Sequence, residues 1–148
     1  MDAITELRDE HVALTQTADE VRRALRDGDR PTVLVHLTGL VSSLSRHVER
    51  EEAGIFTALR EHGEFAEEVA SLEGEHVSLD TAIAALDPEG DGFDDAVSRL
   101  LDELDVHIER EDLGIFPVSV VTLGASGWET VERAHADHPS NLSERTTR

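Results

Sequence analysis

Two short stretches of the chain carry a histidine followed four residues later by a glutamate. They are His47 with Glu51 and His107 with Glu111. In an α-helix, residues i and i+4 lie one above the other on the same face, about 5.4 Å apart along the axis. An imidazole can then bind one metal ion, with Fe, Zn, Cu and Ni all suitable, while the two oxygens of the carboxylate reach a second ion. Both stretches therefore suit a site for two metal ions.

An internal repeat supplies two more candidate ligands. Residues 47–56 match residues 107–116 with seven of ten identities, and residues 7–14 share the pattern L-x-x-E-H-V-x-L with residues 72–79. The second pattern contains His11 and His76. Two similar helix hairpins can pair about a pseudo-twofold axis, so that each gives one lone histidine and one His-x-x-x-Glu to a common centre. The predicted metal ligands are His11, His47, Glu51, His76, His107 and Glu111.

Each of these residues alone has an ordinary explanation. A histidine on an apolar stripe is usually a hydrogen-bonded core residue, and one His-x-x-x-Glu pair can lie on a surface. Six such residues on buried stripes would each cost several kcal/mol if nothing compensated them, and their symmetric placement needs a common cause. We therefore favour a metal site over a bundle without metal.

The other histidines are predicted not to be ligands. His36 shares a stripe with His47 but lies about 16 Å away along the helix axis. His62 is further from the pattern, and His135 and His138 lie outside the repeat.

The elements that position these residues are predicted to be helices, because apolar residues recur at every third and fourth position. Four apolar stripes span residues 4–25, 33–59, 69–86 and 97–115, with breaks at Gly28, Gly63 and the loop 87–92. Pro117 is expected to end or kink the fourth helix. The predicted fold is all-α, an antiparallel up-down-up-down four-helix bundle over residues 1–117. Residues 118–148 are predicted to form a C-terminal extension with a last helix near 128–136 and a polar tail that we expect to be frayed.

Composition excludes several function classes. The 148 residues contain 33 Asp and Glu against 13 basic residues, a net charge of −20, so nucleic acid and anionic membranes are poor partners. Cysteine is absent, which excludes disulfides and thiolate ligands. The start of the chain does not look like a signal peptide, and no apolar run approaches the roughly 18 residues of a membrane span. We expect a cytoplasmic monomer or weak homodimer whose partner is a small molecule.

The order of these motifs resembles the hemerythrin-like, or HHE cation-binding, family, and looks closest to its stand-alone actinobacterial members, some of which act on hydrogen peroxide. The resemblance covers about residues 1–117. It implies a non-haem di-iron centre bridged by Glu51, Glu111 and an oxo or hydroxo group. It also implies that His11 and His47 hold one iron, and that His76 and His107 hold the other.

One position departs from the oxygen-carrying members of that family. They have a fifth histidine four residues before the one matched by His76, and this chain has Leu72 there. Each iron would then have five ligands and could keep an open sixth position. Two adjacent open positions favour a ligand that spans both metals, such as peroxide. Glu73 or Asp80 could fill a position instead, although a solvated helix face is the simpler interpretation of each.

The leading hypothesis is therefore catalase-like decomposition of hydrogen peroxide. The alternative is reversible binding of O2 or NO, or sensing of oxygen or iron, without turnover. Ferritin-like storage is disfavoured, because such sites use Glu-x-x-His. Zinc or manganese could also occupy these ligands. The charged neighbours of the two motifs are expected to support the ligands from outside at best, and mostly to form ordinary surface: Glu49, Arg50, Glu52, Glu109, Arg110 and Asp112.

Overall fold

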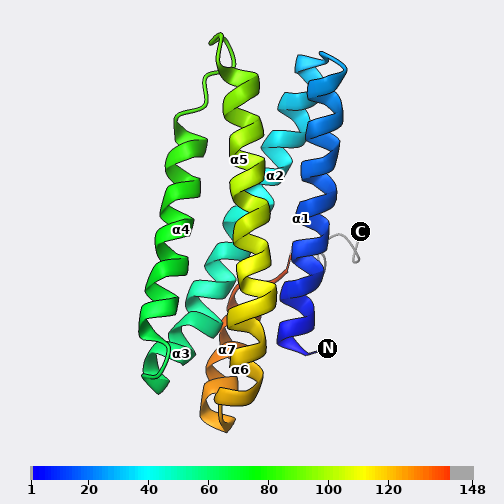
Figure 1. The fold of residues 1–148 in the computed structure, drawn as a ribbon. Coiled ribbons are helices and arrows are strands. Elements are labelled where there is room, and N and C mark those ends of the chain that lie inside the picture. Colours follow the sequence, from blue (N-terminus) through cyan, green and yellow to red (C-terminus); the bar gives the residue numbers. More distant parts are fainter. Residues whose placement is uncertain (1, 141–148) are drawn as a thin grey trace.

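A computed structural model describes residues 2–140, and within that range every regular element is helical. Four long helices run antiparallel and side by side (Figure 1), so the predicted up-down-up-down bundle is confirmed. They are α1 (Ala3–Arg26), α2 (Arg30–Glu51), α4 (Ala66–Ala84) and α5 (Phe93–Arg110). Short segments extend two of them: η1 (Glu52–Phe56) and α3 (Thr57–His62) follow α2, and η2 (Glu111–Ile115) and α6 (Phe116–Thr122) follow α5.

Local sequence signals explain where the helices begin and end. The Asp2 side chain accepts a hydrogen bond from the Ile4 amide at the start of α1, and Asp29 accepts one from Thr32 at the start of α2. Side chains of this type satisfy amide groups that have no partner inside the helix. Gly63 ends α3 with φ of 90°, a left-handed conformation that favours glycine.

Both extensions begin with a π-helical turn, which starts directly after the predicted ligand Glu51 in one half and at the predicted ligand Glu111 in the other. The turns η1 and η2 lie at nearly the same place in the two halves of the repeat. Of the two outcomes predicted for Pro117, an end or a kink, the end is wrong, since the helix continues to Thr122 with Pro117 in the first turn of α6. The widened turn before Pro117 already lacks the regular α-helical hydrogen bonds that a proline would break. The repeat has Thr57 at the matching position, so proline does not cause the π turn.

The apolar core consists of two clusters on either side of the predicted ligands. One contains Leu14 and Leu44 together with their repeat counterparts Leu79 and Leu104. The other surrounds Phe56 and Phe116 at the opposite end of the bundle. The predicted metal ligands lie between these clusters along the sequence of each helix, so they occupy the middle of the bundle interior.

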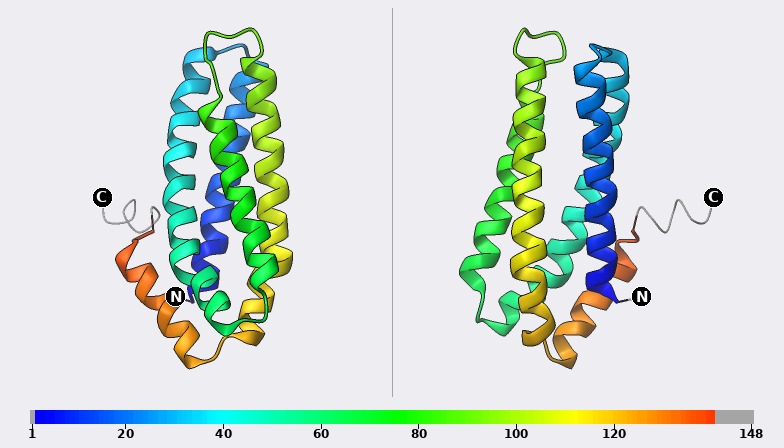
Figure 2. Two further views of the ribbon diagram at one scale, coloured as in Figure 1. Left: turned by 90° about the vertical axis from the view of Figure 1, so that its left-hand side faces the viewer. Right: turned by 45° about the vertical axis from the view of Figure 1, so that its right-hand side comes forward.

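The C-terminal helix α7 (Ala125–Asp137) packs against η1 and α3 on the outside of the first hairpin (Figure 2). The expected last helix is therefore present, and most of the predicted polar tail lies outside the described residues. The predicted domain boundary at residue 117 falls inside α6 and stays a prediction. Within residues 2–140, no helix combines the length and the apolar character needed to cross a membrane.

Candidate metal centre

The structure brings all six predicted ligands together in the bundle interior, where each side chain is at most 5 % exposed. Their donor atoms form two groups, in each of which every atom lies within 4.8 Å of the others. One group contains His11 and His47, the other contains His76 and His107, and both groups share Glu51 and Glu111. This division of the histidines is the one that the resemblance implied.

The inward-facing Nε2 atoms of the imidazoles lie next to the two glutamates. His11 Nε2 is 2.9 Å from Glu111 Oε1, and His107 Nε2 is 3.1 Å from Glu111 Oε2. Glu51 Oε1 lies 3.1 Å from His47 Nε2 and 3.5 Å from His76 Nε2. Each glutamate thus faces imidazoles from both halves of the repeat, as a carboxylate that bridges two ions must.

The outward-facing Nδ1 atom of every imidazole is paired with a further carboxylate. A carboxylate that accepts the Nδ1–H fixes the tautomer and the ring orientation, and leaves the Nε2 lone pair free for a metal ion. The four pairs are His11 with Asp112 (2.8 Å), His47 with Glu10 (2.6 Å), His76 with Glu52 (3.0 Å) and His107 with Glu75 (2.8 Å).

Only two of these four outer carboxylates were among the charged neighbours predicted to support the ligands. Glu10 and Glu75 had not been singled out, although both belong to the repeated Glu-His dipeptide. Glu52 and Asp112 support the ligands from outside, which the sequence allowed for these neighbours, because both hydrogen-bond to imidazoles. The expectation of ordinary surface is wrong for Arg50, which is 1 % exposed. Three of the six charged neighbours are exposed as expected: Glu49, Glu109 and Arg110.

Several donor atoms at the centre have no hydrogen-bond partner among the described residues. They include both carboxylate oxygens of Glu51, Oε2 of Glu111 and Nε2 of His47, all of which are buried. Leaving such atoms unsatisfied costs free energy, and a metal ion would satisfy them. Six carboxylates touch the ligand imidazoles, and their negative charge is offset only in part by Arg110 and by Arg50, which also pairs with Glu6. The centre therefore favours cations. The nitrogen and carboxylate donors therefore fit two transition-metal ions.

The pKa shifts of the metal-free residues indicate that the centre attracts positive charge. Burial lowers the pKa of His47, but the charge of Glu51 and the hydrogen bond to Glu10 outweigh it and raise the pKa to about 10. For His76, burial is likewise outweighed, by hydrogen bonds to Glu111 and Glu51, and the pKa rises to about 11. Burial raises the pKa of Glu111, but its imidazole neighbours hold that pKa well below the usual range. Protons on the imidazoles thus occupy the place that cations would take.

Aromatic rings close the centre on the side of the extensions. Phe116 stacks on His11 with ring centroids 5.2 Å apart, and Phe56 stacks on His76 at 5.5 Å. Both phenylalanines are fully buried. The pair follows the repeat, so each half contributes one ring that shields the other half's lone histidine from solvent.

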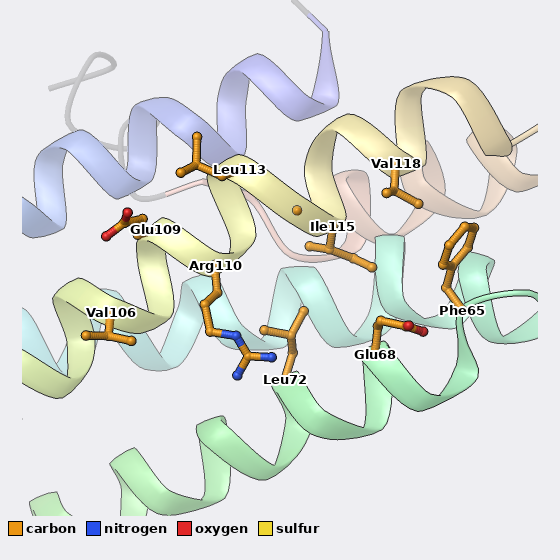
Figure 3. A pocket seen from close by; sticks show the side chains of 10 residues that line it. Phe65, Glu68, Leu72, Val106, Glu109, Arg110, Leu113, Ile115 and Val118 are labelled. Atoms are coloured by element: carbon orange, nitrogen blue, oxygen red, sulfur yellow. The ribbon is translucent and has the colours of Figure 1, made fainter.

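Leu72 lines a pocket of about 560 Å³ between α4 and the α5 extension. Figure 3 shows Leu72 and Ile115 pointing into the space between their helices, with Arg110 close to Leu72.

Glu73 and Asp80, the two residues that could fill an open metal position instead, belong to neither of the two groups of donor atoms. Glu73 lies 2.6 Å from Arg60, and Asp80 is exposed.

The four histidines predicted not to be ligands lie outside both groups of donor atoms. His36 pairs with Glu20, and His62 is exposed. His135 accepts a hydrogen bond from Arg50, which makes it part of the surroundings of the centre rather than a ligand.

A family model described as the hemerythrin HHE cation binding domain matches residues 2–119. This match spans the four long helices and all six predicted ligands. Comparison with curated proteins and comparison with solved structures each yielded no match.

Proposed function

The chain belongs to the hemerythrin HHE cation-binding domain family, and from this premise we propose that it holds two iron ions and decomposes hydrogen peroxide in a catalase-like reaction. The observation that carries the proposal is the pair of four-residue donor groups that share Glu51 and Glu111. The resemblance to stand-alone actinobacterial members, some of which act on peroxide, supports this choice of substrate.

An iron pair supplies two one-electron changes, which together match the two electrons that peroxide gives up or accepts. Two molecules of hydrogen peroxide yield two of water and one of O2, so atoms and electrons balance without an external reductant. The chain's own residues have three tasks. The outer carboxylates hold the imidazoles in the tautomer that binds metal, Glu51 and Glu111 would each help to hold both ions, and Phe56 and Phe116 shield the centre from water.

The residue at position 72 supports a reaction with peroxide rather than oxygen carriage. Leu72 is 3 % exposed and offers no donor atom to the ion held by His76 and His107. Its repeat counterpart Leu7 is also fully buried. Both ions would then keep a position for an external ligand. The largely apolar pocket beside Leu72 suits the approach of a small uncharged molecule such as hydrogen peroxide.

The test is oxygen release from the iron-loaded chain. The chain is loaded with two equivalents of Fe²⁺ without oxygen, supplied with hydrogen peroxide, and followed with an oxygen electrode. His47→Ala and Glu111→Ala should lose iron and activity, whereas the exposed His62→Ala should keep both.

Oxygen release no faster than from free iron would overturn the catalase-like function. A stable, reversible spectral change with O2 would favour a carrier instead. Fewer than two ions per chain would overturn the two-ion site itself.

A further inference from the structure

The two halves of the repeat differ most clearly at their matched arginines. Arg50 and Arg110 each stand three residues after a histidine ligand, and each pairs with the glutamate that holds that histidine. Arg50 is 1 % exposed, whereas the Arg110 side chain is 49 % exposed. The same sequence position is therefore buried in one half and solvated in the other.

The C-terminal helix covers Arg50, which also pairs with Glu6 of α1. Arg50 Nη1 donates to the backbone carbonyls of His135, at 3.3 Å, and His138. Arg50 Nη2 donates to Nδ1 of His135 at 3.0 Å. The helix α7 packs closely against η1, since a Cβ on Gly54 would lie only 3.3 Å from Cβ of Ala134. The matching Gly114 has no such neighbour among the described residues.

The buried guanidinium continues this contact toward the metal centre. Arg50 Nε lies 3.1 Å from Glu10 Oε2, while the other oxygen of Glu10 is 2.6 Å from His47 Nδ1. Glu10 is itself 6 % exposed. A charge pair shielded from water acts far more strongly than one exposed to it. Arg50 thus fixes both the place and the charge of the carboxylate that orients His47, and solvent weakens the matching effect of Arg110 on Glu75 and His107.

We propose that Arg50 is a positioning residue that links α7 to His47 through Glu10, and that it makes the metal position at His11 and His47 bind more tightly than the position at His76 and His107. This inference rests on the two-ion site of the proposed function. It assigns the C-terminal extension a role at the centre, because the end of α7 supplies three of the acceptors around the guanidinium, beside Glu6 and Glu10 of α1.

The test compares Arg50→Gln with its matched control Arg110→Gln in the full chain. Metal-free protein is titrated with Co²⁺ in competition with a chelator, and both the stepwise affinities and the visible absorption bands of Co²⁺ are recorded. Losing an outer partner of a ligand typically weakens metal binding 10- to 100-fold. Arg50→Gln should weaken one of the two steps about tenfold and shift the bands of that ion. His47→Ala should abolish the same step. Arg110→Gln should change either step by less than about threefold.

Rescue by a conservative change separates positioning from general damage. Arg50→Lys should recover part of the lost affinity, since it keeps the positive charge near Glu10. Equal effects of Arg50→Gln and Arg110→Gln, or equal weakening of both steps by Arg50→Gln, would overturn the inference. Should Arg50→Gln not fold, Arg50→Lys and Arg110→Lys form a second pair, in which equal losses would overturn it. Fewer than two Co²⁺ in the wild-type chain would instead contradict the two-ion site.

Discussion

Leu72 is the residue at which this chain departs from the oxygen-carrying pattern, and it lies one helical turn before His76. Leu72→His would place a fifth imidazole next to the ion at His76 and His107. We expect the metal-free variant to be less stable than wild type by about 1–3 kcal/mol, because a polar group replaces a buried leucine. Iron should restore much of this loss by binding the new imidazole. With one open position filled, oxygen release from peroxide should fall about tenfold or more.

The control for this change is Leu37→His, in the apolar cluster at the loop end of the bundle. It should destabilise the chain comparably, yet gain no stability from iron beyond the wild-type response. Thermal unfolding with and without iron measures both variants. An equal response of the two variants to iron would mean that position 72 does not reach the metal.

The histidine ligands give the metal-free chain an unusual dependence on pH. His47 and His76 have pKa values of about 10 and about 11 in the folded chain, above the ordinary value of 6.5. A raised pKa contributes stability that is fully present below pH 6.5 and is lost as pH rises through the folded-state pKa. The urea midpoint of the metal-free chain should therefore fall between pH 7 and pH 10. His47→Gln should flatten this decline, and a midpoint that stays level or rises in wild type would contradict the assignment.

At the scale of helical elements, Gly54 and Gly114 allow a direct test of how α7 docks. Alanine is favoured over glycine in a helix by about 1 kcal/mol. A Cβ at Gly114 meets nothing within 4 Å, so Gly114→Ala should stabilise the chain and raise Tm by about 3 °C. A Cβ at Gly54 would lie 3.3 Å from Ala134, so Gly54→Ala should push α7 outward and cancel this gain. Calorimetry of the two variants distinguishes these outcomes, and equal gains would indicate that α7 does not pack on Gly54.

The long helices and the inner ligands could be predicted because they follow simple periodic rules. The apolar stripes predict the helices, and the four-residue spacing of His47 and Glu51 predicts that both side chains lie on the same helix face. The π turns follow no such rule, since the continuous apolar pattern across residues 55–59 looks α-helical. In an α-helix, the nine steps from His47 to Phe56 make about 2.5 turns, which would turn Phe56 away from the His47 face. The wider turn reduces this rotation, and Phe56 stacks on His76.

At the scale of the whole molecule, the repeat predicts a twofold centre, and the structure adds an element that breaks the symmetry. The outer carboxylates could have been found, because Glu10 and Glu75 recur next to His11 and His76. The burial of Arg50 could not, since it depends on where α7 docks, and α7 has no repeat counterpart within the described residues. The local sequences around Arg50 and Arg110 are similar, so they cannot show that α7 buries only Arg50.

The metal should be part of the stability of the molecule, because the buried carboxylates of the centre have few other partners. An ion present at 100 times its dissociation constant stabilises the folded state by about 2.7 kcal/mol per site. For a chain of this length, two such ions should raise Tm by roughly 10 °C or more.

General screening of the net charge of −20 is the competing explanation for a rise in Tm. Mg²⁺ separates the two, since this hard cation screens surface charge but has little affinity for imidazole. Calorimetry with Fe²⁺ under anaerobic conditions, with Mg²⁺, and with excess chelator should show the large rise for Fe²⁺ alone, and His107→Ala should reduce it. An equal rise with Mg²⁺ would mean that surface screening, and not the centre, accounts for the effect.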